Sequence, residues 1–267
     1  MLGAIIGDIV GSRFEWHNIK TKYFGFFSAQ CHPTDDTVMS LAIAQALLDS
    51  RPDYQHLEQN AIKHMQRIGC QYFHAGYGGM FRKWLQTDNP QPYGSYGNGS
   101  AMRVSPCGYA ARSLDEALAL ADAVTRPTHN HPEGIKGARA AAAAIYLARS
   151  GKSIAEIRQH IEEHYYRLDF TLDSIRASYK FDVTCQGSVP QALVAFFEST
   201  SFEDAIRSAI SIGGDSDTIA AITGPIAQAH WGIEDWMRQR ALEYLDEAQR
   251  AILLAFEAAY MKNTYTP

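Results

Sequence analysis

The sequence predicts an all-α fold in a single compact multi-helix domain that spans residues 1–267. Apolar residues recur every three or four positions along most of the chain, which is the period of a helix with one buried face. No apolar/polar alternation of period two continues beyond a few residues, and no repeat of about 20 to 50 residues is visible. With 267 residues, 46% of them hydrophobic, the chain can bury one large core.

The first predicted helix covers the apolar residues 1–10. Gly3, Gly7 and Gly11 recur every four residues, which places them on one helix face where a second backbone can approach closely. Asp8 interrupts the apolar run, and no basic leader or small-residue cleavage site accompanies it, so no signal peptide is expected. A strand feeding a nucleotide-binding glycine loop is disfavoured, because both G-x-G-x-x-G and G-x-x-x-x-G-K-[ST] are absent.

The rest of the chain alternates between predicted loops and predicted helices. Residues 12–31 mix polar and aromatic side chains without a period, and residues 70–106 are rich in Gly, Tyr, Asn and Pro, so both regions are predicted to be loops. In a helix over 189–198, Ser188 is the expected cap and Pro190 lies in the first turn. Further helices are predicted at 34–48, 57–68, 114–124, 154–165, 202–210, 219–229 and 236–261, and another, after Gly134, contains the run 138–145.

Two acidic segments lie at helix starts that are far apart in the sequence. After the glycine pair 213–214, Asp215, Asp217 and Thr218 present three oxygen-bearing side chains where a helical pattern begins. Thr34, Asp35, Asp36 and Thr37 do the same before the helix that ends near residue 48. Ordinary helix capping is the alternative interpretation, but a cap needs only one such side chain.

If the two segments converge, they form a site for divalent cations. Each pair of like charges about 4 Å apart costs about 4 kcal/mol at an effective dielectric constant of about 20, so the aspartates need cations or protons. Carboxylates and hydroxyls are ligands for Mg²⁺, Ca²⁺ or Mn²⁺. Zinc is disfavoured because Cys31 and His32 precede the first segment without a matching pair at the second.

Two further segments carry polar groups suited to a small ligand. Residues 93–103 form a glycine-dense stretch with Ser, Tyr and Asn, which can contact phosphates, a base and a sugar, although a plain surface loop has the same composition. His129 and His131 stand two apart, yet Pro132 follows and no further nitrogen or sulfur ligand completes a metal site.

Charge and cysteine content narrow the class of partner. The net charge is −5, the isoelectric point is near 6.0 and no run is dense in Lys or Arg, so neither nucleic acid nor a membrane is an expected partner. No apolar run of about 20 residues could span a bilayer. The four cysteines are scattered and favour neither a zinc site nor disulfides, as expected of a cytoplasmic protein.

Five motifs, in order, resemble those of the ADP-ribosylglycohydrolases, the family that includes the dinitrogenase-reductase-activating glycohydrolase and the ADP-ribosyl-acceptor hydrolases. The resemblance runs from residue 3 to about residue 232, through residues 7–15, 34–37, 94–99, 128–129 and 213–218. It implies an all-α fold that holds two Mg²⁺ or Mn²⁺ ions. The positions that match the family's metal ligands are Thr34, Asp35, Asp36, Asp215, Asp217 and Thr218.

The same resemblance implies a substrate pocket. Glu15 matches the glutamate of the family's mobile substrate-gating loop. The pocket for pyrophosphate and adenosine is implied at Gly94, Ser95, Tyr96 and Gly97, with Asn98 and His129 near the distal ribose and phosphates. Some members hold adenine with a second aromatic residue shortly before this segment. Here Pro90, Gln91 and Pro92 stand there and leave Tyr93 as the candidate.

The resemblance therefore implies a binuclear-metal hydrolase that removes ADP-ribose from protein side chains, with ADP-ribosyl-arginine as the expected substrate. Asp36 or Glu15 is expected to accept the proton of the attacking water. Other ADP-ribosyl linkages, namely serine, O-acetyl-ADP-ribose or nucleic acid, are alternative substrates. A non-enzymatic, crystallin-like relative is the alternative from another functional class.

Overall fold

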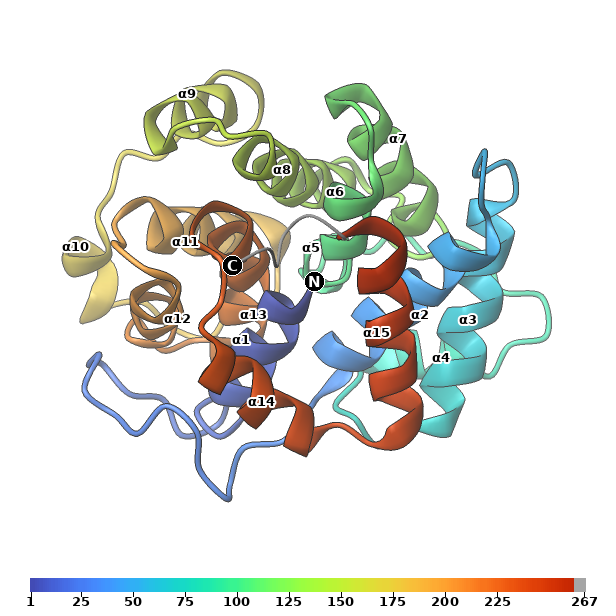
Figure 1. The fold of residues 1–267 in the computed structure, drawn as a ribbon. Coiled ribbons are helices and arrows are strands. Elements are labelled where there is room, and N and C mark those ends of the chain that lie inside the picture. The colour runs from blue at the N-terminus through green and yellow to red at the C-terminus, as the bar shows by residue number, and fades with distance from the viewer. Residues whose placement is uncertain (262–267) are drawn as a thin grey trace.

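The computed structural model describes residues 1–261, and the predicted all-α fold is confirmed (Figure 1). Residues 262–267, the end of the predicted domain, lie outside the described residues. No strand occurs in the described part, where one isolated β-bridge joins Gly97 and Thr184. The helices are α1 (Leu2–Ser12), α2 (Asp35–Asp49), α3 (Leu57–Gln71), α4 (Gly79–Leu85), α5 (Gly99–Met102), α6 (Ser105–Ala110), α7 (Leu114–Thr125), α8 (Pro132–Arg149), α9 (Ile154–His164), α10 (Leu172–Arg176), α11 (Cys185–Phe197), α12 (Phe202–Ile210), α13 (Ser216–Trp231), α14 (Asp235–Tyr244) and α15 (Glu247–Tyr260).

Helices α1 and α13 lie side by side at the centre of the molecule. Every residue of α1 is buried, and α13 is buried from Ser216 to Gln228. The predicted close approach along the glycine face of α1 is confirmed, because Gly3, Gly7 and Gly11 lie directly against the backbone of α13. A Cβ on Gly11 would lie 2.5 Å from the Cα of Asp217. The glycines therefore set the spacing of the two central helices.

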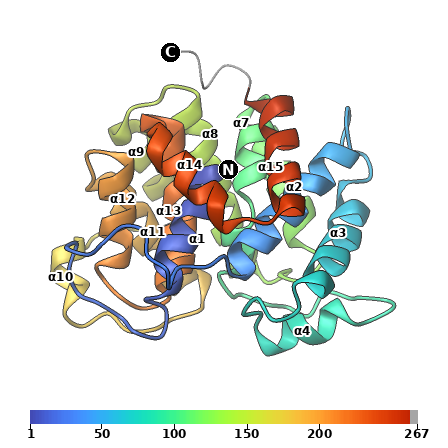
Figure 2. The ribbon, with the colours of Figure 1, turned by 60° about the horizontal axis from the view of Figure 1, so that its bottom comes forward.

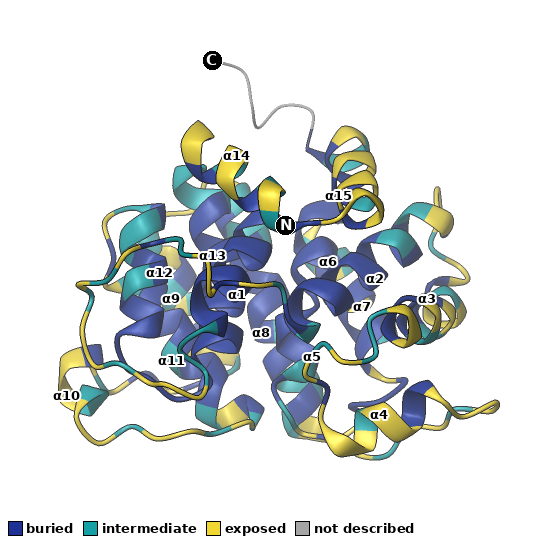
Figure 3. Ribbon diagram, turned by 90° about the horizontal axis from the view of Figure 1, so that it is seen from below, coloured by how far each residue is buried: buried dark blue, intermediate teal, exposed yellow. Residues whose placement is uncertain are grey.

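The other helices surround this pair. In Figures 1 and 2, α2, α3, α4 and α15 lie on one side of α1 and α13, and α10, α11 and α12 lie on the other. Figure 3 shows α1, α13 and much of α8 as buried, with exposed residues concentrated on peripheral helices such as α10 and α14. The alanine run 140–144 of α8 is fully buried, so small side chains allow close helix packing there. No helix of residues 1–261 is both long and apolar enough to cross a bilayer.

Side-chain caps fix the starts of several helices. The hydroxyl of Thr34 accepts a hydrogen bond from the Asp36 N–H at the start of α2, and Ser113 and Ser201 cap α7 and α12 in the same way. Before α13, Gly213 and Gly214 have φ values of +68° and +76°, which favour glycine. This turn delivers Asp215 to the helix start.

The region 70–106, predicted to be a loop, contains two short helices and the start of a third. These are α4, α5 and α6, and the five-residue helix α10 was not predicted either. Residues 100–110 are all buried. Burial against the neighbouring helices, especially α8, overrides the weak helical signal of Gly, Ser and Pro in this segment.

Two predicted helix boundaries were wrong. Helix α11 begins at Cys185 with Thr184 as its cap, so Pro190 lies inside the helix, and Ser188 instead donates a hydrogen bond to the Thr184 carbonyl oxygen (2.6 Å). The helix predicted over 236–261 is two helices, α14 and α15, because Asp246 forms a capping box with Gln249 and starts a new helix.

Candidate active site

The structure brings the two acidic helix starts together and places a carboxylate of α1 beside them. Asp36 of α2, Asp217 of α13 and Asp8 of α1 each offer one oxygen, and these oxygens lie within 4.8 Å of one another. A second group within the same limit consists of Glu15, Asp215 and Asp217. Asp217 belongs to both groups, so the carboxylates form one continuous acidic centre.

Asp8 is the member of this centre that sequence analysis did not place in the site. It is fully buried, and it accepts hydrogen bonds from the backbone N–H groups of Thr34 (2.8 Å) and Thr37 (3.0 Å) and from both hydroxyls. Asp8 thereby joins α1 to the start of α2. The available signal was a lone carboxylate in an otherwise apolar helix, since a buried charge requires partners.

One hydroxyl from each motif lies within hydrogen-bond distance of Asp36. Thr218 donates to Asp36 Oδ2 at 3.1 Å, and Thr34 lies 3.4 Å from the same oxygen. The other oxygen, Oδ1, is buried without a hydrogen-bond partner. Asp35 differs, because it is half-buried, its carboxylate lies beside Gly76, and it is outside both groups of converging oxygens.

The carboxylates of the acidic centre have no cationic side chain beside them among the described residues. Burial raises the pKa of Asp8 and Asp215, and burial together with the neighbouring aspartates raises the pKa of Asp35, Asp36 and Asp217 well above the ordinary range. None of the ion pairs within residues 1–261 includes these carboxylates. In the absence of a metal ion, these raised pKa values favour protonation of the carboxyl groups.

Glu15 lies at the edge of the centre in the irregular segment that follows α1. It is half-buried, and burial followed by the charges of Asp215 and Asp8 raises its pKa to about 7. Asn18 ties this segment to the α13 turn, because its amide accepts from Gly214 N–H (2.7 Å) and donates to the Gly214 carbonyl oxygen (2.8 Å). Sequence analysis did not identify Asn18, and no local pattern marks it.

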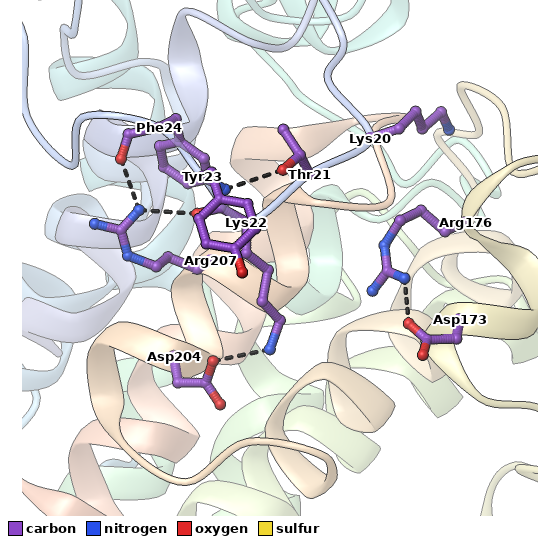
Figure 4. A pocket seen from close by; sticks show the side chains of 9 residues that line it. All are labelled: Lys20, Thr21, Lys22, Tyr23, Phe24, Asp173, Arg176, Asp204 and Arg207. Atoms are coloured by element: carbon purple, nitrogen blue, oxygen red, sulfur yellow. Dashed lines mark hydrogen bonds and ion pairs between the residues drawn. The ribbon is translucent and has the colours of Figure 1, made fainter.

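The continuation of this segment packs against α10, α12 and the turn before α13, where Lys20 Nζ donates to the Ile212 carbonyl oxygen. An open pocket of about 800 Å³ lies there between residues 20–24, α10 and α12 (Figure 4). Its cations are engaged within the chain: Lys22 pairs with Asp204 (2.8 Å), and Arg207 donates to the carbonyl oxygens of Lys22 (3.0 Å) and Phe24 (2.7 Å). These contacts anchor the segment that carries Glu15.

The predicted substrate segment 94–99 borders the acidic centre through Asn98. The Asn98 amide donates to Asp215 Oδ2 at 2.7 Å. Several backbone N–H groups of the segment already have partners within the chain: Gly94 donates to Asn130, Ser95 to Thr128 and Asn98 to Val183. The Gly97 N–H donates to the Ser95 hydroxyl. The segment is thus held rigidly, and fewer N–H groups remain for a ligand than its glycine content suggests.

His129 and two tyrosines complete this side of the site. The buried His129 lies beside Gly97 and Gly99, and burial followed by the charge of Arg103 lowers its pKa well below the ordinary range. The Tyr93 ring is half-buried, with its centroid 6.2 Å from that of His129. Tyr96 is 48% exposed and lies tilted against His131, so its ring is accessible to a ligand.

The sequence model of the ADP-ribosylglycohydrolase family matches residues 1–264. The chain belongs to the ADP-ribosylglycohydrolase family. Its fold agrees, because it superimposes with a TM-score of 0.71 on a structure described as an "ADP-ribosylglycohydrolase-related protein complex", at 23% identity and with 97% of this chain and 96% of that chain covered.

Curated ADP-ribosylglycohydrolase relatives match over most of their lengths. The human ADP-ribosylhydrolase ARH3 is 26% identical, with 88% of this chain and 85% of the relative covered. The ADP-ribosyl-[dinitrogen reductase] glycohydrolase of Rhodospirillum rubrum is 25% identical, with 94% and 92% covered. The ADP-ribosylarginine hydrolase Tri1 of Pseudomonas putida is 26% identical, with 90% and 73% covered.

Proposed function

We propose that this protein is a divalent-cation-dependent hydrolase that releases ADP-ribose from modified arginine side chains of proteins. The family is hydrolytic, and its relatives are named for activity on ADP-ribosylated substrates. The observation that carries the proposal is the buried group of Asp8, Asp36 and Asp217. Packing alone does not favour three buried carboxylates, because each loses hydration and repels the others.

The donor set fits Mg²⁺ or Mn²⁺. The buried Asp36 Oδ1 has no hydrogen-bond partner, and its neighbours are carboxylate and hydroxyl oxygens, the ligands that these ions prefer. Bound cations would polarise a water molecule and the hydroxyls of the substrate ribose. We propose two ions, held by Asp36, Asp215, Asp217 and the hydroxyls of Thr34 and Thr218, with Asp35 completing the set from outside the two groups of converging oxygens. Asp8 would orient the start of α2.

Glu15 is the proposed general base. It is the carboxylate of the centre that lies on an irregular segment and retains partial exposure, so water can reach it. Burial and the charges of Asp215 and Asp8 raise its pKa in the metal-free centre, and bound cations would lower it again, so the carboxylate would be ionised and able to accept a proton near neutral pH. Asp36 is buried and has one oxygen, Oδ1, without a hydrogen-bond partner, so it is better suited to holding a cation. In this proposal Glu15 accepts the proton of the water that attacks C1 of the ribose, the bond from C1 to the guanidinium nitrogen breaks, and the released guanidine takes up a proton from Glu15 or from solvent.

The segment 94–99 would orient the rest of ADP-ribose. The exposed ring of Tyr96 offers a face for adenine, and the contact of Asn98 with Asp215 brings its amide next to the reacting ribose. Ser95 and His129, which both lie beside Gly97, would contact the phosphates. This placement extends the substrate from the surface at Tyr96 to the acidic centre.

An exposed aromatic pair beside Glu15 favours arginine as the modified residue. Trp16 is 73% exposed and Phe181 is 40% exposed, and their rings stack with centroids 5.1 Å apart. An ADP-ribosylated guanidinium keeps its positive charge, and a cation binds well over an aromatic face next to carboxylates. A serine linkage offers no such cation.

The test is hydrolysis of matched peptides that carry ADP-ribose on arginine or on serine, assayed with Mg²⁺. We expect kcat/KM to be at least about tenfold higher for the arginine peptide, the effect of about 1.4 kcal/mol. Equal or faster release from the serine peptide would overturn the arginine assignment. Release from neither peptide would count against hydrolysis of protein-linked ADP-ribose and favour a non-enzymatic relative.

A Trp16→Ala variant tests the aromatic pair separately. Loss of the cation–π contact should raise KM for the arginine peptide about tenfold and leave the affinity for free ADP-ribose unchanged. Trp236→Ala is the matched control, because Trp236 is a partly exposed tryptophan on α14 that packs against Phe26 and Phe27, outside the site.

A further inference from the structure

Arg103, at the end of α5, is a buried cation without a carboxylate partner among the described residues. Its side chain is 1% exposed, and its Nε has no hydrogen-bond partner. Two other arginines near α7, Arg126 and Arg139, both pair with Asp122. Burial lowers the Arg103 pKa to about 10, and the ionisable groups that influence it most are neutral near pH 7. A buried charge that lacks a counter-ion is costly, so this arrangement requires a reason.

The guanidinium of Arg103 points at the end of α7. Its Nη2 donates to the carbonyl oxygen of Val124 at 3.0 Å and to the hydroxyl oxygen of Thr128 at 2.7 Å. Val124 lies in the last turn of α7, where carbonyl groups carry partial negative charge. The ring of Phe81 lies 6.0 Å from the guanidinium carbon. The carbonyl and ring groups partly offset the free-energy cost of burying the charge. The shorter of the two hydrogen bonds of Arg103 goes to Thr128.

The hydrogen bond from Arg103 determines how Thr128 meets His129. The Thr128 Oγ1 lies 2.7 Å from Nδ1 of His129, and no other partner of this hydroxyl is found in residues 1–261. A guanidinium only donates, so the single hydroxyl proton of Thr128 is free to point at Nδ1. Because His129 is neutral, Nδ1 then acts as the acceptor and the ring proton resides on Nε2.

The Nε2–H group faces the proposed ligand segment. Nε2 would lie 3.4 Å from a Cβ placed on Gly99 and 3.7 Å from one placed on Gly97. The absence of side chains at these glycines leaves Nε2 close to the backbone. Several backbone N–H groups of this segment are already used within the chain, so a side-chain donor at this point is well placed for a ligand oxygen.

We propose that Arg103 and Thr128 are positioning residues that hold His129 as the Nε2–H tautomer, which donates a hydrogen bond to a phosphate or ribose oxygen of ADP-ribose. The ligand in this proposal rests on the proposed function. Arg103 acts through Thr128 without itself contacting the ligand, and burial, the larger cause, together with the Arg103 charge keeps the imidazole neutral.

The first test reads the tautomer directly by ¹⁵N NMR of the histidine ring in metal-free protein. In the unaltered protein and in Thr128→Ser, which keeps the hydroxyl, we expect His129 Nε2 to carry the proton. In Thr128→Val, which has nearly the same shape but no hydroxyl, we expect the Nδ1-protonated form to become substantially populated. An unchanged Nε2–H signal in Thr128→Val would overturn the proposed role of Thr128. Arg103→Lys keeps a charge but changes the donor geometry, and should give a mixture of tautomers if it folds.

The second test measures ADP-ribose affinity by calorimetry with Mg²⁺ present. Thr128→Val should weaken binding about 10- to 100-fold, the effect expected for one hydrogen bond to a charged ligand, and Thr128→Ser should stay within about threefold. Full affinity in Thr128→Val would overturn the link between the tautomer and the ligand. If the unaltered protein fails to bind ADP-ribose, the proposed function fails, and the NMR result still decides whether Arg103 and Thr128 set the tautomer.

Discussion

Replacing Gly11 with alanine tests how the two central helices set the geometry of the acidic centre. The new Cβ would lie 2.5 Å from the Cα of Asp217 and 2.8 Å from its backbone nitrogen. Carbon atoms in contact lie about 3.5 Å apart or more, so α1 and α13 must separate locally by about 1 Å. No rotamer change can relieve this clash, because all the nearest atoms belong to the backbone.

The expected cost follows from that displacement. Overpacking costs about 1–3 kcal/mol or more, and it opposes the gain of about 1 kcal/mol that alanine brings over glycine inside a helix. A net loss of about 2 kcal/mol would lower Tm by roughly 4–8 °C in a protein of this size. The same shift separates Asp8 on α1 from Asp217 on α13, and a misplacement of about 1 Å can reduce catalysis about 100-fold.

The assay combines calorimetric Tm with ADP-ribose release from the arginine peptide as a function of Mg²⁺ concentration. We expect a lower Tm, a higher Mg²⁺ requirement and a lower kcat for Gly11→Ala. Gly79→Ala is the control, because Gly79 is also helical and a Cβ there would meet nothing within 4 Å. An unchanged Tm with an unchanged Mg²⁺ requirement would refute the claim that the glycine sets the spacing of the carboxylates.

Three further predictions concern the acidic centre itself. Asp36→Asn and Asp215→Asn should each lower kcat at low Mg²⁺ by more than about 100-fold with little change in fold. The exposed control Asp88→Asn should leave kcat unchanged. Normal hydrolysis by either site variant would contradict the two-cation site. Glu15→Gln should lower kcat far more than the affinity for ADP-ribose, and Glu58→Gln is the exposed control. A kcat within about threefold of normal corresponds to a barrier change of less than about 1 kcal/mol and would exclude a catalytic role for Glu15. The rise in Tm caused by Mg²⁺ should grow from pH 5 to pH 8. The carboxyl pKa values are raised in the folded state, that of Glu15 to about 7, so the metal-free protein binds more protons folded than unfolded and loses stability as pH rises through those values. A Tm increment independent of pH would contradict these shifts.

The sequence by itself determined the helical class, most of the helices and the glycine face of α1. These features depend on local spacing, because a period near 3.6 residues and a glycine every fourth position already define helix faces without knowledge of the partner. It also marked both acidic helix starts, where hydroxyl and carboxylate side chains gather after a turn. The boundary at Asp246 was readable in principle, since its capping box with Gln249 is a local pattern.

The tertiary structure alone decided which of these groups meet. Asp8 is 26 residues from Thr34 in the chain, and Asn18 is 196 residues from Gly214, so no local pattern predicts either contact. The contacts of Arg103 with Thr128, and the burial that keeps α5 helical, likewise depend on packing between distant segments. Sequence periodicity specifies which face of a helix is buried, whereas the partner of each buried polar group is set by long-range packing. That packing turns separate acidic and glycine-rich motifs into one site.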